Sequence, residues 1–89
     1  MGIIRERYTF TGWVQGVGFR YSAKYLAERM DITGWVKNEW DGSVVMEAQG
    51  DAQSLSDFVY QLAGRRFIRI EDIRQEEIPV ESEYGFHIR

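Results

Sequence analysis

The sequence predicts an α+β fold, an open-faced sandwich in which two helices cover one face of a four-stranded antiparallel sheet. Several segments alternate apolar and polar residues with a period of two, which is typical of half-buried strands. Two further segments place apolar residues three and four positions apart, which is typical of amphipathic helices. The resulting order is β-α-β-β-α-β, and two helices can cover only one face of such a sheet. We expect the whole chain, residues 1–89, to form one domain.

The first strand and first helix follow from a change of period near residue 19. Over residues 4–14 apolar and polar side chains alternate, as in a strand with one buried face. One face consists of Tyr8, Phe10, Gly12 and Val14, and the other, mainly polar face consists of Arg7, Thr9, Thr11 and Trp13. From there on the apolar spacing is helical, at Phe19, Ala23, Leu26, Ala27 and Met30. We therefore expect a helix over residues 20–31.

The middle of the chain predicts a β-hairpin followed by a second helix. Asp41-Gly42 separates two β-rich runs, and a tight turn there needs positive φ. The second helix is expected over residues 54–63. Gly64 directly follows it, and we expect this glycine to close the helix in a left-handed conformation.

The last strands are expected at residues 67–78, before Pro79, and around residues 86–88. In the longer strand Ile68 and Ile70 share one face, but Ile73 falls on the other. This change of parity indicates a β-bulge.

Composition excludes several classes of function. The net charge is −3, from 14 acidic and 11 basic residues, which argues against a general nucleic-acid binder. The absence of cysteine excludes disulfides, thiol nucleophiles and thiolate metal sites, and the single histidine, His87, excludes a His–His zinc motif. No stretch approaches the roughly 20 apolar residues of a membrane span. We expect a soluble cytoplasmic protein.

The loop between the first strand and the first helix is the strongest candidate for an anion site. A helix N-terminus offers unpaired N–H groups and a positive dipole end. Gly16 and Gly18 permit the left-handed conformations that form a nest of N–H groups, and Arg20 adds a cation able to hold two phosphate oxygens. The spacing fits neither G-x-G-x-x-G nor a P-loop, so the site is sized for one phosphate. The alternative is an ordinary turn followed by a surface arginine.

Asn38 is the second candidate. It shares a strand face with Val36 and Trp40, and a side-chain amide can both donate and accept, so it can hold a water molecule at a defined angle. The alternative is that Asn38 supports the Asp41-Gly42 turn.

Other polar and aromatic groups are weaker candidates. No serine or carboxylate is placed to make a triad with His87, which we interpret as structural or surface. The adjacent carboxylates Glu71-Asp72 and Glu76-Glu77 point to opposite strand faces, so solvated charge is the favoured interpretation. The three tryptophans fall on different elements: Trp13, Trp35 and Trp40.

Two segments resemble the signatures of the acylphosphatase family. Residues 12–20 (GWVQGVGFR) are similar to its first signature and residues 34–44 (GWVKNEWDGSV) to its second. The resemblance extends over nearly the whole chain. Two positions depart from the family pattern: Trp13 stands where a basic residue is common, and Arg65 where a proline is usual.

The resemblance implies a ferredoxin-like sandwich that hydrolyses acyl phosphates to a carboxylate and inorganic phosphate, with no cofactor or metal. It implies that Arg20 binds the phosphoryl group and that Asn38 positions the attacking water. The phosphate-binding cradle would be the backbone of Gln15, Gly16, Val17, Gly18 and Phe19, together with Arg20. The expected partners are a small acyl phosphate and inorganic phosphate as product and inhibitor. We expect a monomer that binds neither nucleic acid nor membrane.

Two rival functions remain open at this point. The same pocket could bind phosphate or an acidic peptide without turnover. The second rival is a nucleic-acid binder of similar topology that uses the open face of its sheet. It would need exposed aromatic side chains on the sheet and a basic face, and the net negative charge of the chain argues against it.

Overall fold

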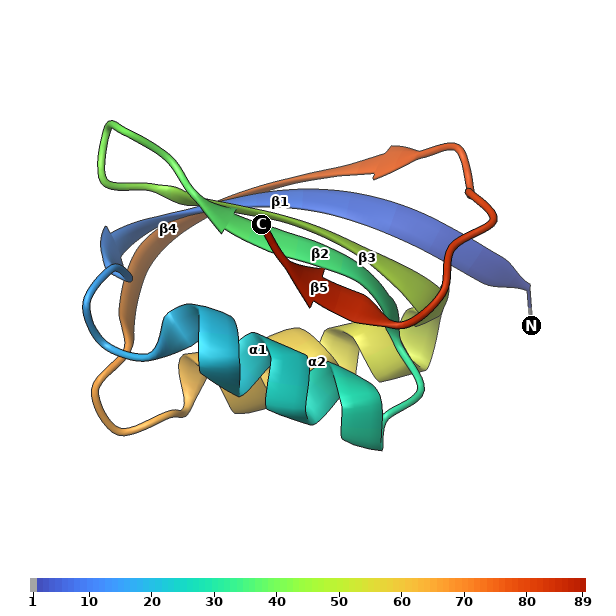
Figure 1. Ribbon diagram of the computed structural model, residues 1–89, viewed down its shortest axis with the longest axis horizontal. Helices are drawn as coiled ribbons and strands as arrows, with labels where there is room; N and C mark the ends of the chain where they lie inside the picture. The colour runs from blue at the N-terminus through green and yellow to red at the C-terminus, as the bar shows by residue number, and fades with distance from the viewer. Residues whose placement is uncertain (1) are drawn as a thin grey trace.

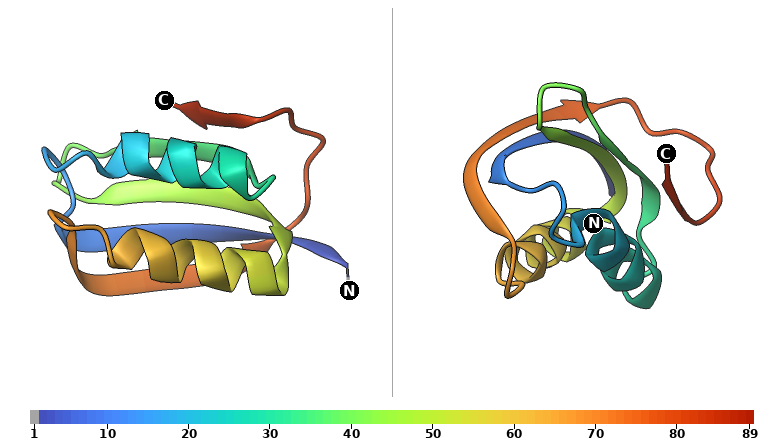
Figure 2. Two further views of the ribbon diagram at one scale, coloured as in Figure 1. Left: turned by 90° about the horizontal axis from the view of Figure 1, so that it is seen from below. Right: turned by 60° about the vertical axis from the view of Figure 1, so that its left-hand side comes forward.

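A computed structural model describes residues 2–89, which form five strands and two helices (Figure 1). In chain order the elements are β1 (Ile3–Trp13), α1 (Phe19–Arg29), β2 (Thr33–Asn38), β3 (Val44–Asp51), α2 (Ala52–Ala63), β4 (Arg69–Ile78) and β5 (Phe86–Ile88). Both helices lie on the same face of the sheet, which confirms the predicted open-faced sandwich (Figure 2).

The sheet is mixed, with strand order β4-β1-β3-β2-β5. Its four longer strands are antiparallel, as predicted, and β5 adds a fifth strand that runs parallel to β2, with Gly34 opposite Phe86. After β4 the chain crosses from one edge of the sheet to the other through residues 79–85 (Figure 2). This segment carries the chain to the free edge of β2, where β5 pairs in parallel although β3, α2 and β4 lie between the two strands in the sequence.

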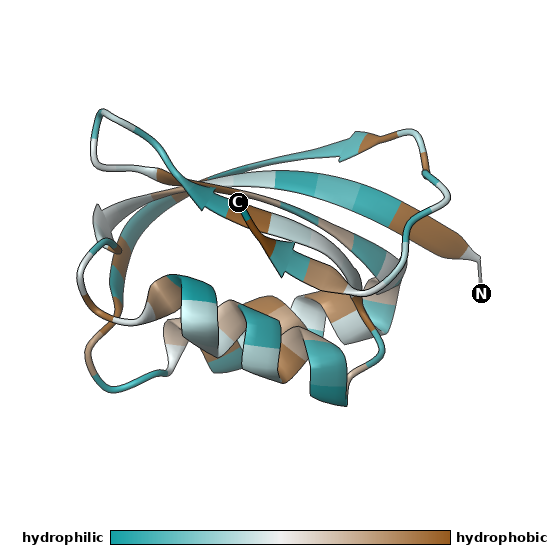
Figure 3. Cartoon of the chain, viewed as in Figure 1, coloured by the Kyte–Doolittle hydropathy of each residue, from teal (hydrophilic) through white to brown (hydrophobic). Residues whose placement is uncertain are grey.

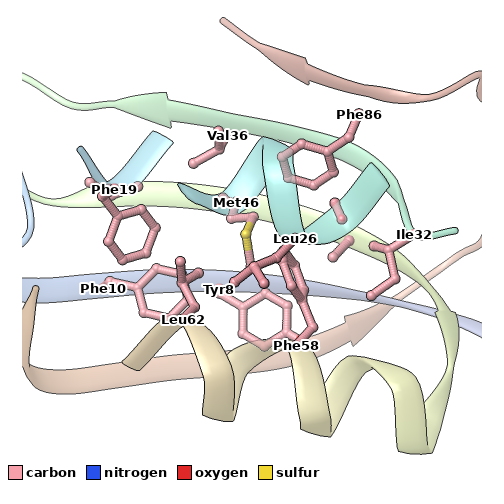
Figure 4. Close-up of a cluster of buried hydrophobic side chains, with 14 of the residues drawn as sticks. Tyr8, Phe10, Phe19, Leu26, Ile32, Val36, Met46, Phe58, Leu62 and Phe86 are labelled. Carbon is pink, nitrogen blue, oxygen red and sulfur yellow. The ribbon is translucent and has the colours of Figure 1, made fainter. Parts of the chain in front are cut away.

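The core lies between the sheet and the helices (Figure 4). The predicted inner face of β1 is buried, with Tyr8, Phe10 and Val14 all at 1% exposure or less. The rings of Phe10 and Phe19 pack with their centroids 4.9 Å apart, so the start of α1 is anchored on β1. Both helices contain polar and apolar residues (Figure 3), and their buried residues are all apolar: Phe19, Ala23, Leu26 and Ala27 in α1, and Leu55, Phe58 and Leu62 in α2. This packing holds the loop between β1 and α1 in place at one end of the sheet.

A β-bulge interrupts the pairing of β1 with β4, as the sequence predicts. Thr11 lies opposite Asp72 and Gly12 opposite Ile70, so Glu71 is the extra residue. Gly12 has φ +123°, and a Cβ atom there would lie 2.4 Å from the Arg69 carbonyl oxygen. Only glycine fits this close approach of two strands.

The prediction that Gly64 closes α2 in a left-handed conformation is wrong. Gly64 has φ −85° and ψ −1°, and its N–H donates to the carbonyl oxygens of Tyr60 and Gln61 at 3.2 Å. The last turn is thus closed by backbone bonds in right-handed geometry, so positive φ is not needed there. α2 also begins two residues earlier than predicted, because Asp51 caps it.

The outer face of the sheet contains one fully buried charge, Arg5. Its Nε donates to Glu47 at 3.0 Å and its Nη1 to Glu83 at 2.8 Å, which ties the crossing segment to the sheet. Burial by itself would lower the pKa of Arg5, but the hydrogen bonds to Glu83 and Glu47 outweigh it and raise that pKa above its usual value.

Candidate functional site

The ends of β1 and β2 meet the start of α1 at one end of the sheet (Figure 1). A hollow of about 170 Å³ lies there, and it contains both candidate side chains, Arg20 from α1 and Asn38 from the last position of β2. The full lining is Val14, Gly16, Gly18, Phe19, Arg20, Tyr21 and Asn38. The fold therefore brings together two side chains that belong to separate sequence signatures.

The loop before α1 has the geometry of an anion-binding nest. Gly16 has φ +74° and Gly18 has φ +77°, as the sequence predicts. A Cβ atom at either position would meet nothing within 4 Å, so glycine is required there by backbone conformation and not by lack of space. Left-handed residues in such a loop turn successive N–H groups toward a common point, where an anion can accept from them.

The N-terminus of α1 is left uncapped. Gly18 is the N-cap residue and has no side chain to accept a hydrogen bond, and the first turn contains no acidic residue. The first backbone bond of the helix runs from the Ser22 N–H to the Gly18 carbonyl at 2.9 Å. The N–H groups of residues 19–21 are therefore available to a ligand, at the positive end of the helix dipole.

The Arg20 guanidinium adds a full positive charge to this end of the helix. It is half-buried, and none of the ion pairs within residues 2–89 involves it. One turn later on the same helix, Lys24 pairs with Glu28 at 2.9 Å. Arg20 is thus a cation whose charge is free to act on a ligand in the hollow.

The side chain of Asn38 contains a buried oxygen, Oδ1, that has no hydrogen-bond partner in the part of the chain that the structure describes. An unsatisfied buried acceptor costs about 1–3 kcal/mol, so a polar ligand or a water molecule that donates to it is favoured. The alternative role, support of the hairpin turn, belongs to Asp41. Its Oδ1 accepts from the N–H and the hydroxyl of Ser43 at 3.0 and 2.7 Å. These bonds, first the hydroxyl and then the backbone one, lower the pKa of Asp41.

Gln15 fastens the loop to the hairpin. Its Nε2 donates to the carbonyl oxygens of Glu39 and Ser43 at 2.7 and 2.9 Å, which holds the end of β2 beside the loop. Neither Gln15 nor Val17 lines the hollow, and Val17 packs against the core. The sequence did not indicate this structural task of the Gln15 amide. It also did not single out Val14 and Tyr21, whose only signal is that they lie inside or next to the first signature.

The other polar and aromatic candidates lie outside the hollow. The His87 ring hydrogen-bonds the Tyr84 carbonyl. The centre of the Trp35 ring lies 5.8 Å from the guanidinium group of Arg7 and 4.8 Å from that of Arg89. Residues 2–89 contain no cluster of three or more side chains suited to hold a metal ion. No helix in that range is both long and apolar enough to span a membrane.

Comparison with known proteins gives concordant matches. The sequence model of one family, described as acylphosphatase, matches residues 6–88. An acylphosphatase of Clostridium acetobutylicum is 46% identical over an alignment of 87 residues, and the match covers 93% of this chain and 96% of that protein. The structure of an acylphosphatase from Coxiella burnetii superposes with a TM-score of 0.90 at 35% identity, covering 98% of this chain and 93% of that one. That from Bacillus subtilis gives 0.90 at 36% identity, with 97% and 98% covered.

Proposed function

The chain belongs to the acylphosphatase family, and we propose that it hydrolyses acyl phosphates by metal-independent attack of water. The observation that supports this mechanism best is the hollow itself. It combines an uncapped helix N-terminus, the Arg20 guanidinium and the unpartnered Asn38 oxygen around a space suited to one phosphoryl group.

In the proposed complex, the phosphoryl oxygens accept hydrogen bonds from the backbone N–H groups of residues 15–20 and from Arg20. Phosphoryl transfer depends mainly on positioning and on neutralising charge on the three equatorial oxygens. The N–H groups supply partial positive charge and Arg20 a full one, so this part of the work needs no metal ion. Because the cradle is preorganised by Gly16 and Gly18, little reorganisation accompanies the reaction.

The nucleophile is a water molecule that donates one hydrogen to Asn38 Oδ1 and presents a lone pair to phosphorus. A bond forms between the water oxygen and phosphorus, and the bond between phosphorus and the acyl oxygen breaks. The electron pair of the broken bond leaves with the carboxylate. The water proton passes to a phosphate oxygen, so the products are a carboxylate and inorganic phosphate.

The leaving group explains why this site needs no strong general acid. A carboxylate is a stable anion and departs without being protonated. His87 and the paired carboxylates of β4 lie outside the hollow, and the proposed reaction has no step for them. We also propose a monomer that acts in the cytoplasm on a free small molecule; the mechanism uses only Arg20, Asn38 and the loop before α1, and so requires no second copy.

Continuous hydrolysis of benzoyl phosphate tests the proposal. We expect saturable turnover, competitive inhibition by inorganic phosphate, and full activity in the presence of a chelator. Loss of activity on chelation would contradict the metal-independent mechanism. Saturable phosphate binding with no turnover of any acyl phosphate would instead identify a non-catalytic anion-binding module.

A further inference from the structure

The hollow that contains Arg20 and Asn38 is small compared with a whole substrate. Its volume is about 170 Å³, whereas pockets that enclose a drug-sized ligand measure roughly 300–1,000 Å³. In the proposed complex a phosphoryl group and one water molecule occupy this space. A bulky acyl group therefore extends through the mouth of the hollow, and the side chains at the mouth are the ones that can select it.

Two polar side chains of the lining are already engaged in the proposed complex. Asn38 holds the water, and Arg20 binds the phosphoryl oxygens. The attacking and leaving oxygens of phosphoryl transfer lie roughly in line. The acyl group is therefore on the side of the phosphorus atom opposite to this water, and it extends away from Asn38 Oδ1.

Four other residues of the lining offer no side chain to an acyl group at the mouth. Val14 and Phe19 are buried and belong to the core. Gly16 and Gly18 are exposed but have no side chain. The one lining residue that remains for the acyl group is Tyr21.

Tyr21 places an aromatic ring at the mouth of the hollow. It directly follows Arg20 in the first turn of α1, and it is 72% exposed although it lines the hollow. Within residues 2–89 its ring takes part in no aromatic pair and no cation–π contact. The ring of Tyr25, one turn later, differs, because it lies 5.4 Å and 5.6 Å from two guanidinium groups. The Tyr21 ring is therefore available to a ligand.

We propose that Tyr21 contacts the acyl group of the substrate and selects acyl phosphates with an aromatic acyl group over those with a short aliphatic one. A flat ring covers the exposed Tyr21 ring, and a pair of aromatic rings gains more than the apolar area that it buries. This inference rests on the proposed hydrolytic function and adds to it the substrate class and the side chain that selects it.

Kinetics with two substrates test this contact. The acyl group of benzoyl phosphate contains a flat ring, whereas that of acetyl phosphate ends in a methyl group and cannot cover the Tyr21 ring. The measured quantity is the selectivity ratio, which is kcat/KM for benzoyl phosphate divided by kcat/KM for acetyl phosphate. An unfolded fraction lowers both values equally and so leaves this ratio unchanged. The difference in intrinsic reactivity of the two substrates cancels when a variant is compared with the wild type.

Three substitutions of Tyr21 separate the possible contacts. Tyr21→Ala removes the ring and is expected to lower the selectivity ratio about tenfold. Tyr21→Phe keeps the ring without the hydroxyl and is expected to retain the ratio. Tyr21→Leu keeps apolar bulk without a flat ring and is expected to give an intermediate ratio. Tyr60→Ala is the matched control, since Tyr60 is an exposed tyrosine of α2 that does not line the hollow.

The outcomes separate this inference from the proposed function. A wild-type selectivity ratio in Tyr21→Ala would overturn the contact with the acyl group and leave hydrolysis intact. A ratio in Tyr21→Phe as low as that in Tyr21→Ala would overturn the ring contact in favour of a hydrogen bond from the hydroxyl, and a wild-type ratio in Tyr21→Leu would overturn the selection of aromatic groups. Failure of the wild-type protein to hydrolyse either substrate would overturn the proposed function, and this inference with it.

Discussion

The first turn of each helix has backbone N–H groups that find no partner within the helix. The two helices differ in what is offered to these groups. At α2, Asp51 caps the helix: its carboxylate accepts from the Ser54 N–H at 2.9 Å and from the Ser54 hydroxyl at 3.0 Å. At α1, Gly18 occupies the same position and offers no side chain. Both helices pack on the same sheet, so the difference does not come from the architecture.

The helix end that we propose as the anion site differs from the other by the absence of a side-chain cap and of an acidic residue in its first turn. A side-chain cap at α1 would add a few tenths of a kcal/mol over glycine. A cationic residue in the first turn is also unfavourable for the helix dipole, yet Arg20 stands there. Both local costs are offset if an anion binds to the N–H groups and to Arg20. At α2 the N–H groups are satisfied within the protein, and that end can only stabilise the fold.

Removing the cation from the uncapped end has the largest expected effect. Arg20→Ala should raise KM and nearly abolish turnover, because in the proposed complex Arg20 contacts the phosphoryl group in both the ground state and the transition state. We expect kcat/KM for benzoyl phosphate to fall about 10³–10⁵-fold. Arg74→Ala, which removes an arginine outside the hollow that contains Arg20 and Asn38, is the matched control and should retain activity. A folded Arg20→Ala protein with activity within tenfold of wild type would contradict the role of Arg20.

Asn38→Ala tests the group opposite this helix end. It removes the unpartnered oxygen that would hold the nucleophilic water. We expect kcat to fall about 10²–10³-fold, with the inhibition constant of inorganic phosphate unchanged, because in the proposed mechanism Asn38 holds the water and not the phosphate. Turnover of benzoyl phosphate at the wild-type rate would rule out the water-positioning role.

A pair of variants at Gly18 makes the α1 terminus resemble that of α2. Asn and Asp both tolerate positive φ better than other residues, and a Cβ atom at this position meets nothing within 4 Å. Gly18→Asp adds a negative charge beside the cradle and Gly18→Asn does not. We expect phosphate inhibition to be weaker in the Asp variant than in the Asn variant by on the order of tenfold to a hundredfold. Equal inhibition constants would mean that the anion does not bind at this helix end.

The smallest effect is expected at the capped end. Asp51→Ala removes the cap of α2 and should lower the melting temperature by about 5 °C without changing kcat/KM. Asp51→Asn retains a capping oxygen and is the control for charge. A loss of activity in either variant, at a temperature where that variant is fully folded, would contradict a purely structural role for the N-terminus of α2.

The same variants have a defined pH dependence. Hydrogen bonds from the backbone N–H and then the hydroxyl of Ser54 lower the pKa of Asp51 in the folded protein. A depressed carboxyl pKa contributes stability that is present above the unfolded value near 3.9 and is lost as pH falls through the folded value. Thermal unfolding of the wild type should therefore lose more stability below about pH 4 than that of Asp51→Asn.

Much of the fold was predicted from patterns among residues that are close together in the sequence. The inner face of β1, the hairpin at Asp41-Gly42 and the bulge of β4 were all predicted from parity or from a residue pair, because strand alternation and turn chemistry act between near neighbours. The positive φ angles of Gly16 and Gly18 were predicted for the same reason. At Gly64 this approach failed, since backbone hydrogen bonds closed the helix without a left-handed residue.

Contacts between residues that are far apart in the sequence are harder to predict. Nothing in the local pattern of residues 86–88 indicates that they pair in parallel with β2, and nothing near Arg5 indicates that Glu83 will cover it. Such contacts depend on the route of the crossing segment, which composition and periodicity do not encode. The same holds for the side chain of Gln15, whose hydrogen bonds to the hairpin carbonyls had no signal in the sequence.

By itself, the sequence determined the types and order of the main elements and the two signatures that carry the family resemblance, because each is written in neighbouring residues. Only the tertiary structure decided that Arg20 and Asn38 share one hollow and that, among residues 2–89, the Asn38 oxygen is left without a hydrogen-bond partner. These facts depend on strand order and register, which bring residues from distant parts of the chain to the same end of the sheet.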